Sequence, residues 1–222
     1  MSADGSPGES PAGSPAESPA ESPAESPAGS PAESLVEKIA RVLKDEVALA
    51  PYDPRWPELA AQEAAHLRAC LPGELLGRVE HFGSTAVPGL VAKPVVDLLV
   101  ETPDLAAARS AFPPVLEAQG YDAFWRPTRG DDGPPWYLWF IKRDAAGART
   151  HHIHVVEPHF EHWERLLFRD HLRAHPEVGE AYGDLKRRLA ADHPGDRVAY
   201  TEGKTAFVVE VTARAKATRL QG

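Results

Sequence analysis

The stretch "HFGSTAVPGLVAKPVVDLL", from His81 to Leu99, joins a Gly-Ser turn to an apolar run that contains one aspartate, Asp97. Alternate side chains of a β-strand point to opposite faces of a sheet. Val96 and Leu98 therefore share an all-apolar face, which we expect to pack against helices, while Asp97 points to the other face. Because an unpaired carboxylate buried on a strand costs several kcal/mol, we expect Asp97 to belong to a ligand site on that second face.

Strands precede helices along the remainder of the chain. Strands are expected at 46–50, 78–82, 94–101, 121–125, 136–142 and 151–157. Helices are expected at 35–44, from an Asp53 cap to Leu71, at 104–119, and in three segments after Pro158 that are divided at Pro176 and at 193–196. The loop 126–135 is expected to be mobile. Strands followed by helices indicate an α+β fold, with a mixed sheet flanked by helices and a C-terminal helical region.

The first 34 residues differ from the rest in composition. Proline recurs at every fourth position from Pro7 to Pro31, mostly within "ESPA" or "GSPA". Proline at this spacing prevents helix formation, and the segment has almost nothing apolar to bury. We therefore expect a disordered tail over residues 1–34 and one folded domain over residues 35–222.

The net charge of −9 is concentrated in the tail. Residues 1–34 contain six acidic residues and no Lys or Arg, so the remaining residues carry a net charge of −3. A nearly neutral domain lacks the basic field that duplex nucleic acid requires, although a local phosphate pocket needs only a few cations. No stretch approaches the roughly 18 apolar residues of a membrane span, and no signal pattern begins the sequence. We therefore expect a cytoplasmic protein without a membrane partner.

The segment "HHIHVV", residues 151–156, supplies a second group of polar side chains. His152 and His154 are two residues apart on an expected strand, so they share one face and lie roughly 7 Å apart. Two imidazoles at this spacing can serve one metal ion or one phosphate group. The alternative is a structural role. Any single histidine would then belong to a cluster whose hydrogen bonds are satisfied, and Asp97 would cap a neighbouring helix.

Three further features are typical of phosphate binding. The Gly83–Ser84 turn leaves a strand and presents backbone amides and a hydroxyl group. Lys93 precedes Pro94, which imposes an extended backbone and fixes where the lysine emerges. Lys204 shares one helical face with apolar residues of the segment 197–208, so its amino group can reach inward. A surface position in solvent is the alternative for Lys204.

These motifs together resemble the GrpB family and, more broadly, the nucleotidyltransferase superfamily. The resemblance covers about Val47 to Ala213. It is carried, in family order, by "VALAPYDPRWP" from Val47, "EHFGSTAVPGLVAKPVVDLLV" from Glu80, "HHIHVV", "LFRDHLRAHPE" from Leu167 and "YTEGKTAFV" from Tyr200. The fold that this resemblance implies is a nucleotidyltransferase-like mixed β-sheet.

The resemblance also implies a site for a nucleoside triphosphate and a divalent metal, magnesium or manganese. Phosphate binding is assigned to Gly83, Ser84, Thr85, Lys93 and Lys204. The metal is assigned to Asp97, His152 and His154, and the catalytic roles to Asp97 and His154. One departure from the superfamily pattern is that Leu99 stands where a second carboxylate is expected on the strand. Imidazole suits zinc or manganese better than it suits magnesium, so this departure bears on the choice of metal.

Three functions follow from this set of residues. The first is an enzyme that transfers a nucleotidyl group from a small-molecule nucleotide to an acceptor that the sequence does not identify. The second is a non-catalytic module that binds a nucleotide or a CoA-like ligand, which the leucine at position 99 favours. The third is a metal-dependent phosphohydrolase built on Asp97 and the histidines.

Deletion of residues 1–34 is expected to leave the melting temperature and ligand binding unchanged, because this segment has almost nothing to bury. Thermal melts of the full-length and shortened chains, each with and without ATP, measure this. A melting temperature several degrees lower in the shortened chain would show that the tail packs on the domain.

Overall fold

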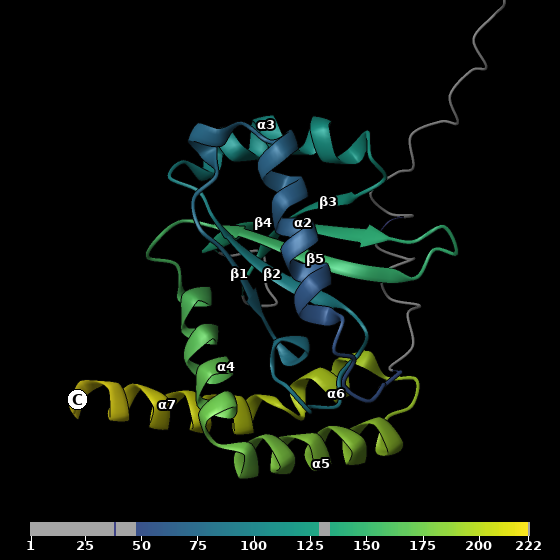
Figure 1. The fold of residues 1–222 in the computed structure, drawn as a ribbon, viewed down its shortest axis with the longest axis vertical. Coiled ribbons are helices and arrows are strands. Elements are labelled where there is room, and N and C mark those ends of the chain that lie inside the picture. Colours follow the sequence, from purple (N-terminus) through teal and green to yellow (C-terminus); the bar gives the residue numbers. More distant parts are fainter. Residues whose placement is uncertain (1–37, 39–47, 129–133, 222) are drawn as a thin grey trace, which may run out of the picture.

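A five-stranded mixed β-sheet organises the chain in the computed structural model, which describes Lys38 and residues 48–128 and 134–221 (Figure 1). The strand order is β1-β2-β5-β4-β3, with β2 and β5 parallel and the other neighbouring pairs antiparallel. The strands are β1 (Val79–Phe82), β2 (Val96–Glu101), β3 (Asp122–Pro127), β4 (Trp136–Arg143) and β5 (Arg149–Val156). Helices flank the sheet, which confirms the α+β class expected from the sequence.

Five of the six expected strands begin and end within two residues of their expected positions. The strand expected at 46–50 is wrong. Of its described residues only Ala50 pairs, in a single bridge with Ala92 whose two backbone hydrogen bonds measure 2.8 and 3.0 Å. Pro51 follows directly and has no N–H to extend the pairing.

Several predictions fall on segments outside the described residues. The tail over 1–34 lies there, and so does the helix expected at 35–44 except for Lys38, which is helical. The loop expected at 126–135 is in part a strand, because Arg126 and Pro127 belong to β3 and pair with β4. Residues 129–133 of that loop are not described.

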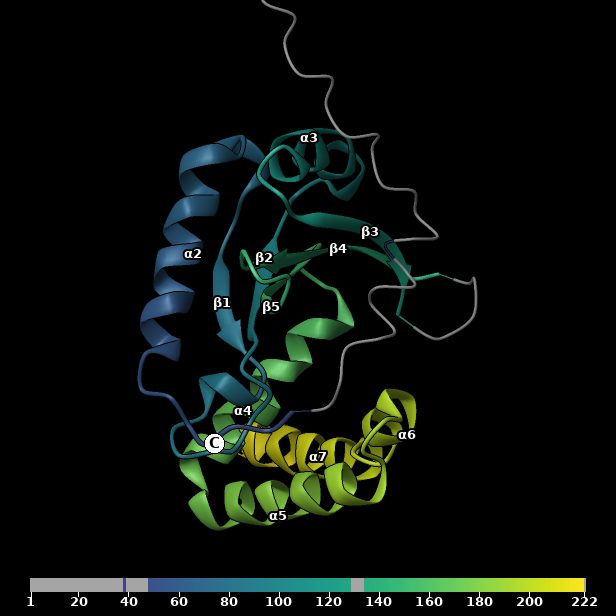
Figure 2. The same cartoon turned by 90° about the vertical axis from the view of Figure 1, so that its right-hand side faces the viewer.

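The first face of the sheet is covered by α2 (Trp56–Cys70) and α3 (Leu105–Glu117), which appear beside and above the strands in Figure 2. Trp56, Leu67 and Phe112 of these helices pack in one core with Val96 and Leu98 of β2. Burying one such large side chain is worth about 1.5–3 kcal/mol. The all-apolar face of β2 therefore packs against helices, as the alternation predicts.

The helix starts differ in how they are capped. Asp104 caps α3, where its carboxylate accepts a hydrogen bond from the backbone N–H of Ala107 at 2.9 Å. Asp53 is not the N-cap of α2, contrary to expectation. Its carboxylate instead accepts the backbone N–H of Arg55 at 2.9 Å, one residue before the helix begins, and also bonds the Arg55 guanidinium.

The second face of the sheet carries a smaller apolar cluster that includes Leu99, Tyr137 and Trp139. It is covered by Phe160, Trp163 and Leu166, from the segment that contains η3 (Glu161–Glu164) and the start of α4 (Arg165–Ala174). Asp97 lies on this face of β2 with its side chain 26% exposed. The second face is thus partly covered, and solvent reaches the carboxylate.

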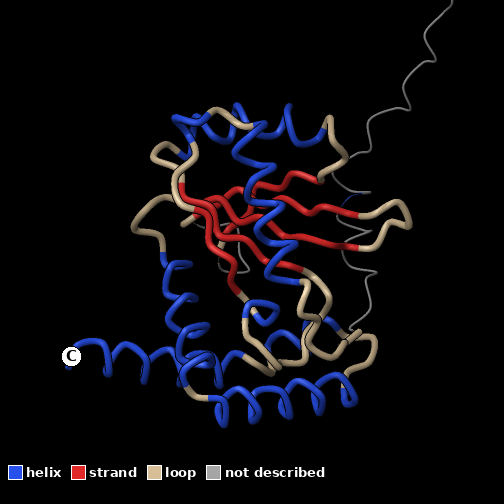
Figure 3. The backbone as a smooth tube through the Cα atoms, viewed as in Figure 1, coloured by secondary structure: helices blue, strands red, loops and turns tan. Residues whose placement is uncertain are grey.

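Three more helices gather beyond one end of the sheet, at the bottom of Figures 1 and 3: α5 (Pro176–Asp192), α6 (Arg197–Glu202) and α7 (Thr205–Gln221). The divisions expected at Pro176 and at 193–196 are confirmed. The last segment was expected to be one helix, but it is broken between α6 and α7. Gly203 lies at the break, and a Cβ there would come within 2.5 Å of the Leu189 side chain. Glycine is also a poor helix former, which favours a break here. None of the helices in the described ranges is long and apolar enough to cross a membrane.

The junction between β1 and the short helix η2 (Ser84–Ala86) depends on Gly83. Phe82, the last residue of β1, pairs with Asp97, so Gly83 lies directly beside that carboxylate. Gly83 has φ of 73°, and a Cβ on it would come within 2.6 Å of Asp97 Oδ2. The residue must therefore lack a side chain for two reasons, its left-handed backbone and its contact with Asp97.

We expect Gly83→Ala to destabilise the protein by roughly 2–4 kcal/mol, because backbone strain and a steric clash add. The matched control is Gly89→Ala: Gly89 has φ of 76°, but no described atom lies within 4 Å of its Cβ position. Gly89→Ala should lower the free energy of unfolding only through backbone strain, by about 1 kcal/mol. Chemical denaturation measures both values. Equal losses would show that the contact with Asp97 does not constrain this turn.

Candidate functional site

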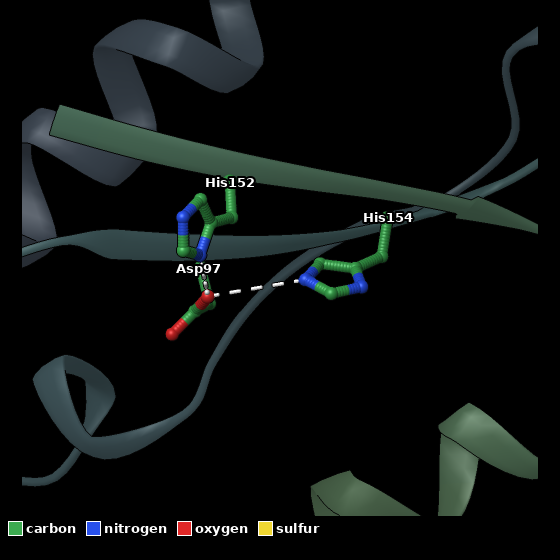
Figure 4. Close-up of side chains that lie close together, drawn as sticks. All are labelled: Asp97, His152 and His154. Atoms are coloured by element: carbon green, nitrogen blue, oxygen red, sulfur yellow. Dashed lines mark hydrogen bonds and ion pairs between the residues drawn. The ribbon is translucent and has the colours of Figure 1, made fainter. Parts of the chain in front are cut away.

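Asp97, His152 and His154 form one cluster on the second face of the sheet (Figure 4). His152 Nδ1 donates a hydrogen bond to Asp97 Oδ1 at 3.0 Å, and His154 Nε2 lies 3.9 Å from the same oxygen. One ligand atom from each residue lies within 4.8 Å of the other two. The three residues that the family resemblance assigns to one metal ion therefore lie together.

The parallel pairing of β2 with β5 brings this cluster together. Asp97 is the register partner of His152, and Leu99 is the register partner of His154. The imidazoles of His152 and His154 thus line up along β5 next to the carboxylate. Both side chains are mostly buried, with 13% and 9% exposed.

The Gly83–Ser84 turn adjoins the cluster, and its three predicted phosphate ligands are not equivalent. Burial raises the pKa of Tyr182 on α5, and the nearby side chain of Ser84 partly opposes this effect. Thr85 is buried, and its hydroxyl lies 3.0 Å from His81 Nε2, within hydrogen-bonding distance. The Thr85 side chain therefore stabilises the turn, whereas Gly83 and Ser84 lie at the edge that is partly exposed.

Lys93 and Lys204 come from distant parts of the chain and meet at one aromatic ring. Their Nζ atoms lie 4.6 and 4.3 Å from the ring centroid of Tyr200, which is buried on α6. Burial, together with the nearby charges of Arg197 and Lys204, lowers the pKa of Lys93 to about 7. Burial likewise lowers the pKa of Lys204 to about 8. Two ammonium groups held this close favour an anion between or beside them.

Asp97 is the carboxylate that offsets these cations. Its charge partly opposes the lowering of the pKa of both lysines. On the other side of the cluster, Arg149 Nη1 lies 3.5 Å from His152 Nε2. Several basic groups thus surround one acid, and this arrangement favours a polyanionic ligand.

The sequence reasoning missed part of the surroundings of this cluster. His162, which was given no function, is 2% exposed, and its ring centroid lies 5.8 Å from that of His154 and 4.7 Å from that of Tyr137. Burial, together with the nearby charges of Arg165 and Arg126, lowers the pKa of His162 to about 3. No local signal points to this position, because His162 reaches His154 only through the packing of η3 on β4.

The donor set of the cluster fits a divalent metal ion. Burial lowers the pKa of both His152 and His154, so both imidazoles are neutral near pH 7 and retain a lone pair for a metal. Two imidazoles and one carboxylate are typical ligands of manganese, zinc and similar ions, whereas magnesium prefers oxygen ligands. Asp97, His152 and His154 would hold such an ion.

Comparison with known proteins identifies relatives along most of the chain. The family model described as GrpB protein matches residues 46–214. A UPF0157 protein of Pseudomonas aeruginosa is 41% identical over 175 residues, which cover 78% of this chain and 69% of that protein. The crystal structure of the conserved protein GrpB from Enterococcus faecalis is 31% identical with a TM-score of 0.67, and the match covers 78% of this chain and 99% of that one.

A further relative is longer than this chain. A protein named dephospho-CoA kinase, from Mycolicibacterium paratuberculosis, is 30% identical over 197 residues, which cover 79% of this chain but 47% of that protein. The match thus spans about half of the kinase. Taken together, the matched residues and the solved structure show that this chain belongs to the GrpB family.

Proposed function

We propose that the protein binds a nucleoside triphosphate on the second face of the sheet and transfers its nucleotidyl group to an acceptor. The observation that carries this proposal is the meeting of Lys93 and Lys204 at Tyr200, close enough to Asp97 for its charge to act on both. Lysines of lowered pKa regain their full charge when a polyphosphate lies beside them. The triphosphate would lie between these lysines and the Gly83–Ser84 turn.

The order of the elements supports nucleotidyl transfer as the reaction. A Gly-Ser turn after one strand, followed by an aspartate in the middle of the next, resembles the nucleotidyltransferase superfamily. In such a transfer an acceptor oxygen attacks the α-phosphorus, the bond to pyrophosphate breaks, and the acceptor proton passes to a base. His154 is neutral and lies beside Asp97, so it is placed to take that proton where Asp97 and His152 alone hold the metal, because an imidazole that ligates the metal has no free lone pair.

A divalent metal held by Asp97, His152 and His154 would neutralise negative charge on the phosphates. Superfamily members use a second carboxylate on the same strand, but here Leu99 is fully buried in the apolar cluster of the second face. The register places His154 next to that leucine, on the neighbouring strand. An imidazole therefore stands near the position of the missing acid, which favours manganese or zinc over magnesium.

A non-catalytic module that binds a nucleotide or CoA-like ligand is the second candidate. The missing carboxylate at position 99 favours it, because binding needs the lysines and the turn but not a complete metal site. The similarity to half of a dephospho-CoA kinase is a further reason to test a CoA-like ligand. The two candidates differ in whether metal strengthens binding and whether pyrophosphate is released.

Lys204→Ala is expected to weaken ATP binding roughly tenfold or more, because charge-assisted hydrogen bonds contribute about 1.5–3 kcal/mol. Isothermal titration calorimetry measures the affinity. The matched control is Lys216→Ala, since Lys216 lies on α7, 44% exposed, in a surface ion pair with Glu164. Unchanged affinity in the Lys204 variant, or an equal loss in both variants, would contradict phosphate binding at Tyr200.

Asp97→Asn keeps the shape of the side chain but removes its charge, so we expect ATP binding to lose its response to Mn²⁺. The measurement is ATP affinity with and without Mn²⁺, together with pyrophosphate release. A control on the same strand is His151→Asn, because His151 alternates with His152 and lies on the opposite face of β5. If the wild-type protein binds ATP equally well without metal and releases no pyrophosphate, the binding module is the correct function.

A further inference from the structure

A second polar cluster adjoins the proposed nucleotide site on the side of β4. It comprises Tyr137, Trp139, His154 and His162, which we call the His-Trp cluster. All four side chains are buried, with residue exposures of 5, 4, 7 and 2%. Their rings contact one another: Tyr137 stacks on His154 with centroids 5.5 Å apart, and Trp139 lies 6.1 Å from His154.

Three nitrogen atoms of this cluster have no hydrogen-bond partner among the described residues: Trp139 Nε1, His154 Nδ1 and His162 Nε2. A buried polar atom without a partner destabilises the folded state, so native structures rarely leave several together. In Figure 4 the Nε2 atom of His154 faces Asp97, while Nδ1 lies on the far side of the ring. His154 therefore belongs to both the Asp97 site and the His-Trp cluster, with one nitrogen toward each.

Two exposed arginines lie near the rings of this cluster and of Phe82. The Cζ atom of Arg126 lies 4.6 Å from the ring centroid of Trp139. The Cζ atom of Arg165 lies 5.9 Å from the ring centroid of Phe82, whose ring in turn contacts His154 edge-on at 5.2 Å. Both arginines are exposed residues, so a ligand that arrives from solvent can meet them.

The chemistry of these groups selects the class of ligand. An indole N–H can only donate a hydrogen bond, and a guanidinium carries donors and a permanent positive charge. Both arginines act electrostatically on His154 and His162, so a metal cation is disfavoured at this position. A neutral imidazole can donate with one nitrogen and accept with the other. The matching ligand is an oxyanion, a carboxylate or a phosphate group.

We propose that the His-Trp cluster, with Arg126 and Arg165, is a second anion site that holds a carboxylate or phosphate group of the acceptor. The identification of the bound group as part of the acceptor rests on the proposed function. The anion site itself can be tested separately. An acceptor held here lies one imidazole ring away from Asp97. His154 then contacts the acceptor with one nitrogen and faces the nucleotide site with the other.

The indole N–H resonance of Trp139 reports directly on this site. Inorganic phosphate and acetate are titrated separately into ¹⁵N-labelled protein at constant ionic strength, and the indole resonances are assigned with Trp139→Phe. We expect a saturable downfield shift of the Trp139 resonance, because its N–H gains an acceptor. Trp163 is the internal control, since its Nε1 already donates to the carbonyl of Glu157 at 2.9 Å and should not move.

Variants distinguish this site from a general effect of charge. Arg126→Ala is expected to weaken the anion affinity seen at Trp139 by roughly tenfold. Its matched control is Arg109→Ala, because Arg109 lies over Trp125, 4.3 Å from its ring centroid, and Trp125 packs on the opposite face of the sheet. This control should leave the affinity unchanged. The affinities of acetate and inorganic phosphate are then compared. The probe that binds more tightly shows whether a carboxylate or a phosphate is the preferred group.

The outcomes separate this inference from the proposed function. If Lys204→Ala abolishes ATP binding while the Trp139 shift persists, the two sites are distinct, as proposed. If the protein fails to bind ATP but Trp139 still responds, the second anion site stands and nucleotidyl transfer fails. The absence of a saturable shift, an equal shift at Trp163, or equal losses in the Arg126 and Arg109 variants would each overturn the second site.

Discussion

The parallel pairing of β2 with β5 is the interaction on which the candidate site depends. This pair lies inside the sheet, between β1 and β4, and its register sets Asp97 beside His152. A shift of one residue in either strand would turn the polar side chains into the helix-covered face and expose their apolar neighbours. The core under α2 and α3 therefore fixes the position of the site, because Val96 and Leu98 cannot leave it without losing their burial.

Charge balance is the physical reason for proposing a phosphate ligand at this position. Asp97 is one acid among basic groups that include Lys93, Lys204 and Arg165, and its charge acts on each of them. Burial lowers the pKa of both lysines toward neutrality. A polyanion would offset the cost of burying the two ammonium groups and so restore full charge to the lysines, whereas an apolar ligand would not. The arrangement is thus better suited to a ligand with several negative charges than to a neutral one.

The sequence predicts the parts of the site that depend on local periodicity. Alternation along each strand was sufficient to separate Asp97 from Val96 and Leu98 and to put His152 and His154 on one face of their own strand, because the period of a strand is independent of its neighbours. It also suggested that Lys204 reaches inward, although the helix expected there is broken after Gly203. The shared contact of Lys93 and Lys204 with Tyr200 was not predictable, since it joins residues more than a hundred positions apart. The position of His162 depends in the same way on how η3 packs against β4.

The same charge balance bears on how a metal would enter the proposed site. A divalent cation alone would approach Asp97 against the field of the surrounding lysines and arginines. Each pair of like unit charges costs about 2 kcal/mol at a separation of roughly 7 Å and an effective dielectric constant of about 20. A metal that arrives with a triphosphate brings net negative charge instead, so the same cations attract it. In the proposed function, the nucleotide would therefore carry the metal to Asp97 and the two histidines, and the basic surroundings would weaken the binding of metal without it.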